Sequence, residues 1–126
     1  MTKEERNKQF VRAHFEEFVN RKNASIISQN MTEDFYDHNG PGDRPTDVAG
    51  DKGMMEAMYV KYPDLQIKIE DIIAEGDKVV CRNTWKGTDH NTGKKIEFHG
   101  FVLWRFRDAK IAERWATVTE PKETEK

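Results

Sequence analysis

The sequence predicts an α+β fold in which three N-terminal helices precede a four-stranded meander. In the first half of the chain, apolar residues recur every three or four positions, which is the spacing of helices that bury one face. After residue 64 the pattern changes to an alternation of apolar and polar residues, which is typical of strands. Helices followed by a run of strands is the order found in α+β domains.

The composition limits the class of protein. A chain of 126 residues favours one domain, which we expect over residues 1–120, with the charged segment 121–126 disordered. A net charge of -2 provides no basic field for nucleic acid. No run approaches the roughly 20 apolar residues of a membrane span, and the charged N-terminus lacks the apolar stretch of a signal peptide. We therefore expect a cytoplasmic protein with neither a nucleic-acid nor a membrane partner.

The first helix is expected over residues 3–20. Thr2 followed by Glu5 fits a capping box, in which a hydroxyl and a carboxylate each accept a hydrogen bond from a free amide at the helix start. Phe10, His14 and Phe18 lie four residues apart and define the buried face, while charged residues occupy the other side.

A short second helix is expected through Ile26, Ile27 and Met31, with Asn23 as its cap. Residues 35–38 then form a short strand or turn. Residues 39–45 form a loop, because Asn, Gly, Pro and Asp are dense there.

A third helix is expected to begin at Asp51, which is a plausible N-cap, and to end at residues 62–64. Its apolar positions are Met54, Met55, Met58 and Tyr59. A row of methionines can line an adaptable pocket, but at helical spacing it is also ordinary core.

Four strands follow, at residues 65–69, 78–86, 97–107 and 111–118, with turns between them. Residues 101–104 are apolar at every position, whereas a strand with one face in water would alternate. The helices can cover only one face of this sheet. We therefore expect a second copy of the chain to cover the other face, giving a homodimer.

Several short motifs in a fixed order resemble the SnoaL-like polyketide cyclases, a branch of the nuclear transport factor 2-like superfamily. The motifs are FYDHNGPG at 35–42, YPDL at 62–65, IIAEGDKVV at 72–80, GT at 87–88 and RFRDAKIAERW at 105–115. The resemblance implies a cone-shaped α+β barrel, with three helices and a curved sheet around a deep pocket and dimerisation through the sheet. It also implies an intramolecular aldol condensation of a polyketide-like carbonyl compound, without metal or cofactor.

One position departs from the pattern of the cyclases. Their key carboxylate follows a Glu-His-Trp-like motif on the last strand, and here the corresponding residues are Glu113-Arg114-Trp115-Ala116. Alanine carries no proton, so another group would have to replace the missing aspartate. Ketosteroid isomerases of this superfamily place an acid on the third strand, and by the same alignment that position holds Val102.

Asp37, His38 and Asn39 are the first candidates for chemistry, because they follow a short strand beside a flexible loop. Resemblance to the isomerases implies a general-base aspartate near this place, onto which Asp37 or Asn39 could map. Burial in an apolar cone would raise the pKa of such a carboxylate toward neutrality. The alternative is that Asp37 and Asn39 only hydrogen-bond amides of their own loop.

His99 is the second candidate catalytic residue, because a neutral imidazole can shuttle protons near pH 7. His14, on the apolar stripe of the first helix, could point a ring nitrogen into the pocket. Either histidine could equally be a hydrogen-bonded core residue. The four histidines lack the spacing of metal ligands, so we expect no metal site.

Arg82 and Arg114 lie within strands, and a buried arginine needs an anionic partner. Arg114 could pair with Asp37 or Glu113, or it could bind a substrate carboxylate through two parallel hydrogen bonds. Tyr59 and Trp104 offer large apolar surface to the same pocket.

The sequence favours a cofactor-independent acid/base enzyme, of cyclase or isomerase type, that acts on a small carbonyl compound. Its catalytic residues would be Asp37, His38 and His99, and its ligand-binding residues would be His14, Asn39, Tyr59, Arg82, Trp104 and Arg114. Two alternatives remain open: a non-catalytic binder of small hydrophobic molecules, and an association domain whose vestigial pocket is filled by its own side chains.

Overall fold

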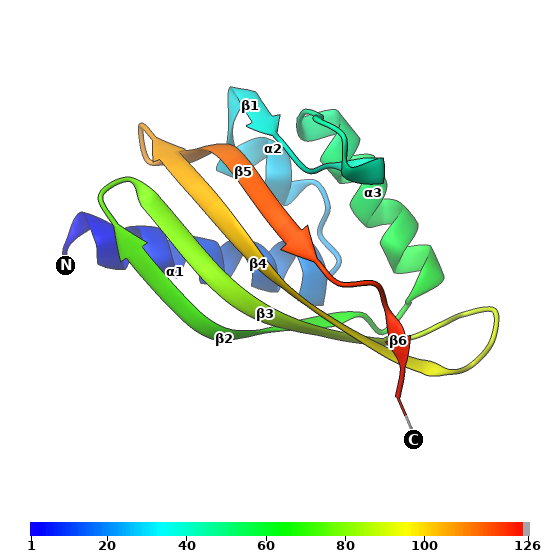
Figure 1. The fold of residues 1–126 in the computed structure, drawn as a ribbon. Helices are drawn as coiled ribbons and strands as arrows, with labels where there is room; N and C mark the ends of the chain where they lie inside the picture. Colours follow the sequence, from blue (N-terminus) through cyan, green and yellow to red (C-terminus); the bar gives the residue numbers. More distant parts are fainter. Residues whose placement is uncertain (125–126) are drawn as a thin grey trace.

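A computed structural model, which describes residues 1–124, confirms the α+β fold (Figure 1). One mixed sheet has the strand order β1-β5-β4-β3-β2, and a short sixth strand pairs beside β4. β1 is parallel to β5 and the other pairs are antiparallel. The strands are β1 Met31–Asp37, β2 Gln66–Glu75, β3 Lys78–Thr88, β4 Lys95–Arg107, β5 Lys110–Val118 and β6 Lys122–Glu123.

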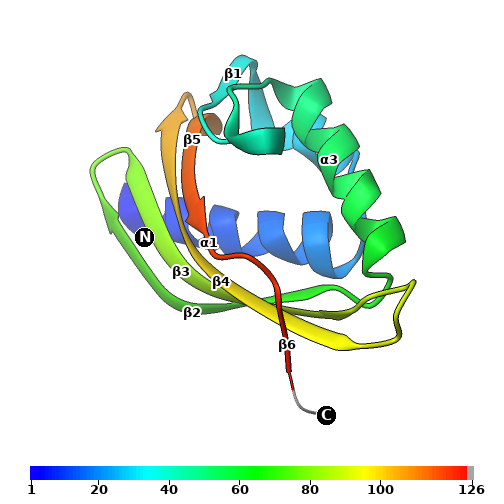
Figure 2. The same cartoon turned by 45° about the vertical axis from the view of Figure 1, so that its right-hand side comes forward.

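The sheet curls around the first helix, and the third helix forms a separate wall (Figure 2). α1 spans Lys3–Phe15 and continues as a π-helical turn, η1 Glu16–Asn20. These two elements together match the predicted helix at 3–20, and the capping box of Thr2 and Glu5 is confirmed. α2 spans Ile26–Asn30, a 3₁₀ turn spans Pro41–Asp43, and α3 spans Val48–Lys61.

Both predicted caps after the first helix are wrong. Ser25, not Asn23, lies at the N-cap position of α2 and makes no side-chain cap hydrogen bond. The N-cap of α3 is Asp47, whose carboxylate accepts a hydrogen bond of 2.9 Å from the Gly50 amide. Asp51 lies inside the first turn of α3 and is buried, with 3% of its surface exposed. The cause is a bridge between Asp37 and Thr46, which ends the extended segment and lets the helix begin earlier.

Several segments form more strand than the sequence predicts, among them β2, which continues to Glu75 beyond the expected 65–69. β1 has seven residues, begins at Met31 and pairs with β5, although the sequence indicated only a short strand or turn at 35–38. Part of the charged tail also pairs. Lys122–Glu123 form β6 against Ile96 and Glu97. Residues 125–126 lie outside the described part of the chain.

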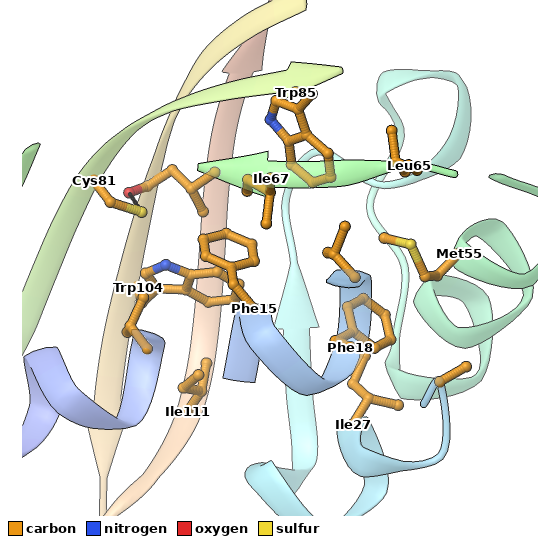
Figure 3. Packing of buried hydrophobic residues seen from close by; sticks show 14 of the residues in the cluster. Phe15, Phe18, Ile27, Met55, Leu65, Ile67, Cys81, Trp85, Trp104 and Ile111 are labelled. Carbon is orange, nitrogen blue, oxygen red and sulfur yellow. Dashed lines mark hydrogen bonds between the residues drawn. The ribbon is translucent and has the colours of Figure 1, made fainter. Parts of the chain in front are cut away.

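The hydrophobic core lies between the concave face of the sheet and the helices (Figure 3). β4 shows how the faces are assigned, since Val102 and Trp104 are buried in this core. Phe101, which points to the other face, keeps 56% of its surface exposed. Within residues 1–124, no helix is long and apolar enough to cross a membrane.

Candidate functional site

A cavity of about 490 Å³ lies between the inner face of the sheet, the helices and the loop after β1. Figure 3 shows side chains that approach one another from α1, η1, α3, β3 and β4. They are, in that order, Phe15, Phe18, Met55, Trp85 and Trp104. The polar groups on the cavity wall are His14, Asn39, Asp43, Asp51, Arg114, Thr117 and Glu120. The cavity therefore combines an aromatic and methionine-rich wall with a polar patch.

Arg114 reaches inward from β5 and pairs with Asp37 at the end of β1. Its Nη1 lies 2.8 Å from Oδ2 of Asp37, which has no exposed surface, and the Arg114 side chain is only 12% exposed. The guanidinium also lies over the Trp104 ring at 5.7 Å. Parallel pairing of β1 with β5 places Asp37 opposite Arg114 in register, which brings the two charges together. Of the alternatives open for Arg114, the structure shows the internal pair with Asp37.

Asp37 has both carboxylate oxygens occupied. Oδ1 accepts a hydrogen bond of 2.9 Å from the Asn39 amide, and Oδ2 accepts the bond from Arg114. Asp37 does not line the cavity. Asp37 lies behind the cavity wall, and it affects the cavity through the two wall residues that it contacts, Asn39 and Arg114.

Asp51 is the carboxyl group that does face the cavity. It reaches the wall from the first turn of α3, and its Oδ1 is buried without a hydrogen-bond partner. Burial, a side-chain hydrogen bond with Asp37 and the negative charge of Asp37 raise the pKa of Asp51 to about 8. Only a protonated Asp51 can donate that hydrogen bond. At neutral pH the cavity therefore holds a carboxylic acid.

Asn39 ties the loop after β1 to the last long strand. Its Oδ1 accepts a hydrogen bond of 2.8 Å from the Ala116 amide, and its Nδ2 donates to Asp43 at 2.8 Å. Both Asn39 and Ala116 line the cavity. Asn39 thus lies on the cavity wall, and its side chain anchors the loop after β1.

His14 also lines the cavity, with 1% of its surface exposed. Its ring stacks on Phe18 at 5.0 Å between centroids and meets the edge of Trp104 at 5.6 Å. Burial, together with the nearby charge of Arg114, lowers the pKa of His14 to about 3. The imidazole is therefore neutral at physiological pH.

His38 lies at the outer face of the sheet and does not line the cavity. Its ring stacks on Trp115 at 4.5 Å, and Nε2 lies 2.8 Å from the Glu113 carboxylate. Hydrogen bonds from His38 and Arg105 hold the pKa of Glu113 below its usual range. The strand register directs Asp37 and His38 to opposite sides, so the two do not form one catalytic pair.

His99 and Arg82 also point away from the cavity. The His99 side chain is 54% exposed and lies 2.9 Å from Glu97, on the face of β4 that carries Phe101. Arg82 is 48% exposed and pairs with Asp71 at 2.7 Å. Strand alternation places both on the outer face, which is a correction to the pocket role of Arg82 and to a role of His99 inside the pocket.

Tyr59 does not line the cavity either. Its hydroxyl donates a hydrogen bond to the Phe18 carbonyl, which joins α3 to the π-helical turn η1. Burial raises the pKa of Tyr59 to about 12. The hydrogen bond of Tyr59 therefore joins two walls of the cavity, whereas Trp104 lines the cavity itself.

The sequence reasoning missed Asp51 as a pocket residue because it read this aspartate as a helix cap. One signal could have revealed it. Asp51 lies four residues before Met55, and residues four apart share a helix face; both are buried, at 3% and 4% exposure. Among residues 1–124, no three His, Cys, Asp or Glu side chains are grouped so that they could hold a metal ion.

Solved structures of similar fold support this architecture. AclR from Streptomyces galilaeus, named as a candidate hydroxylase, has a TM-score of 0.81 and 27% identity, over 91% of this chain and 89% of that one. A candidate polyketide cyclase from Bacillus cereus has a TM-score of 0.74 and 34% identity, over 83% of this chain and 69% of that one. IdmH from Streptomyces antibioticus, a candidate polyketide cyclase, is 23% identical with a TM-score of 0.78, over 87% and 89% of the two chains, and shows the fold alone.

The sequence comparisons give the family. No curated protein matches the chain. The family model of the SnoaL-like polyketide cyclases, however, matches residues 9–120, which is most of the 126-residue chain. Together with the helices, the mixed sheet and the solved structures of like fold, this match shows that the chain belongs to the SnoaL-like polyketide cyclase family.

Proposed function

We propose that this protein is a cofactor-independent acid/base enzyme that moves a proton on a small carbonyl compound, with Asp51 as the proton carrier. The observation that carries the proposal is the Asp51 carboxyl group, which lines the cavity and has an oxygen with no hydrogen-bond partner. Ala116, which also lines the cavity, carries no ionisable group. Asp51 supplies the ionisable group instead, and it does so from α3 rather than from β5, where Ala116 lies.

The surroundings of Asp51 suit this task. An acid/base catalyst works best when its pKa lies near the pH of the reaction, and the pKa of Asp51 is raised to about 8. Asp37, held by Arg114, supplies the negative charge that keeps the proton on Asp51. This role for Asp37 differs from that of a direct base, because Asp37 does not line the cavity.

The chemistry needs one proton to move between two atoms of the substrate. In an aldol closure, the fraction of Asp51 that is ionised, which grows as the pH approaches its pKa of about 8, removes a proton from the carbon beside one carbonyl group. The resulting enolate carbon attacks a second carbonyl group and forms the new C–C bond. Protonated Asp51 then returns the proton to the alkoxide oxygen that this attack creates. No redox partner, metal or cofactor enters the balance.

The cavity wall supports an aromatic or polyketide-like substrate. Its volume of about 490 Å³ lies within the range of small-molecule sites. Aromatic rings and the side chains of Met54, Met55 and Met58 make up much of its lining. Methionine adapts to irregular apolar shapes. The Bacillus cereus relative and IdmH are both named as candidate polyketide cyclases.

Enolisation of 2-tetralone tests the proposal without knowledge of the natural substrate. The α-hydrogens of this aromatic ketone exchange with solvent deuterium, and NMR follows the rate. We expect the protein to accelerate the exchange and Asp51→Asn to reduce that acceleration by about 10²- to 10⁴-fold, the usual contribution of a positioned acid/base group.

Glu56→Gln is the matched control. It removes an exposed carboxylate from the same helix, and the shifted pKa of Asp51 does not depend on that carboxylate. It should leave the exchange rate unchanged. Full exchange activity in Asp51→Asn would show that Asp51 is not the proton carrier.

A second function, binding without catalysis, is favoured by Ala116, because the position that carries the proton in the cyclases has none here. This function predicts that 2-tetralone quenches the fluorescence of Trp85 and Trp104 on the cavity wall while its exchange stays at the solution rate. That pair of results would replace the enzyme with a binding protein. An association domain with a filled pocket is not favoured, since a cavity of about 490 Å³ lies between the sheet and the helices.

A further inference from the structure

His14 is a second polar group on the cavity wall, on the opposite side of the core from α3. It extends from α1 between the rings of Phe18 and Trp104, which fix the plane of the imidazole. With 1% of its surface exposed, it has almost no contact with bulk solvent. The position and orientation of the ring are therefore set by packing.

Asn30, at the end of α2, determines which ring nitrogen carries the hydrogen. Its amide nitrogen Nδ2 lies 2.9 Å from Nδ1 of His14. An amide NH₂ group can only donate, so Nδ1 must accept, and a neutral imidazole then carries its hydrogen on Nε2. Within residues 1–124, no group hydrogen-bonds to Nε2.

Two effects keep the ring neutral in the free protein. A second proton on His14 would have to be buried near the Arg114 guanidinium, and both effects oppose it. A neutral N–H donor that is buried, as His14 is, forms a stronger hydrogen bond than it would in water. It can therefore stabilise a negatively charged oxygen without exchanging a proton with it.

We propose that Nε2–H of His14 donates a hydrogen bond to the carbonyl or enolate oxygen of the bound ligand, and that Asn30 is the positioning residue that fixes this tautomer. The ligand contact rests on the proposed function, since it assumes a carbonyl compound in the cavity. The tautomer does not depend on it.

The first experiment reads the tautomer directly. Long-range ¹H–¹⁵N NMR of the histidine ring distinguishes a protonated nitrogen from an unprotonated one. We expect His14 in the free protein to be protonated on Nε2, and we expect Asn30→Leu to move the ring toward a mixture of tautomers. Gln29→Leu is the control, because it makes the same kind of change at an exposed neighbour on α2. A ring protonated on Nδ1 in the wild type overturns the proposal.

The second experiment reads the ligand contact with 2-tetralone labelled with ¹³C at its carbonyl carbon. A hydrogen bond to the oxygen moves this signal downfield. We expect the shift in the wild type to fall in His14→Phe and to be kept in part by His14→Gln, which retains an N–H donor. Phenylalanine preserves the stacking with Phe18, so the variant should fold. Binding by His14→Phe should be about fivefold weaker, the usual effect of one neutral hydrogen bond.

The outcomes separate this inference from the proposed function. An unchanged carbonyl shift and affinity in His14→Phe overturn the ligand contact, even if exchange still depends on Asp51. Hydrogen bonding from His14 without any catalysed exchange supports the inference and overturns only the enzymatic function. Failure of the wild type to bind 2-tetralone overturns the ligand contact together with the proposed ligand class.

Discussion

Competition between two carboxyl groups for one cation explains the state of Asp51. Asp37 takes the Arg114 guanidinium at 2.8 Å, in a site with no exposed surface. Two neighbouring carboxylates with a single partner cannot both ionise at low cost, so one of them keeps its proton. Asp51 has an unpartnered oxygen and is the one that does so. Asp37 and Arg114 thus form a structural ion pair, and Asp51 beside them is an acid.

This arrangement predicts a pH dependence of stability. The pKa of Asp51 is about 8 in the folded protein and near 3.9 in an unfolded chain. Between these values the folded state holds a proton that the unfolded state has released. The contribution of Asp51 to the free energy of unfolding is therefore full below about pH 4 and is lost as the pH rises through about 8.

Urea unfolding at pH 5, 7 and 9 measures this effect. We expect the stability of the wild type relative to Asp51→Asn to decrease steadily over this range. Comparison with the variant removes the contributions of other groups, such as the His14 imidazole. Parallel stability curves for the two proteins would contradict the raised pKa.

At the scale of elements, the start of α3 decides what the cavity contains. The Asp37–Thr46 bridge stops the extended chain, and Asp47 then caps the helix through the Gly50 amide. Gly50 is needed for close approach, because a Cβ there would overlap the Thr46 hydroxyl. With the helix starting at Val48, Asp51 falls on the face that lines the cavity.

The cap of α3 gives a prediction at this scale. Asp47→Ala should lower the free energy of unfolding by about 0.5–2 kcal/mol, because the helix loses a capping acceptor. Asp47→Asn should stay close to the wild type. Thermal unfolding followed by circular dichroism checks both variants. An equal loss in the two would point to the charge of Asp47 rather than to its cap.

At the scale of the whole molecule, the outer face of the sheet carries an apolar row across four strands. The register aligns Ile73 with Val80, Val80 with Leu103, and Leu103 with Trp115. Ile73 is 64% exposed and the neighbouring Phe101 is 56% exposed. Contiguous apolar surface of this kind is characteristic of interaction sites. We propose that a second copy of the chain covers it.

Light scattering at micromolar concentration should then report about twice the chain mass of 14.8 kDa. Phe101→Lys places a charge in the centre of the face and should yield a monomer. Val60→Lys is the matched control, since Val60 is 71% exposed on α3 and lies away from the sheet. A wild type that is monomeric under these conditions would rule out the dimer.

The outcomes for particular residues show which structural features can be predicted from the sequence alone. The capping box of Thr2 follows from local spacing, and the structure confirms it. His99 and Arg82 could not be assigned to a face, because alternation fixes which residues share a face but not which face is inside. That choice depends on the helices, which pack on one side of the sheet.

The sequence by itself determined the α+β class, the order of the three main helices and the four long strands after them and, through its motifs, the SnoaL-like family, because each depends on local periodicity or on local residue patterns. Only the tertiary structure decided that Asp37 is an ion-pair partner and that Asp51 is the acid in the cavity. The reason is physical. Parallel pairing of β1 with β5 brings Asp37 to Arg114, 77 residues away, while packing of α3 buries Asp51 beside them. The protonation of a carboxyl group depends on such neighbours in space, and these contacts form only in the folded chain.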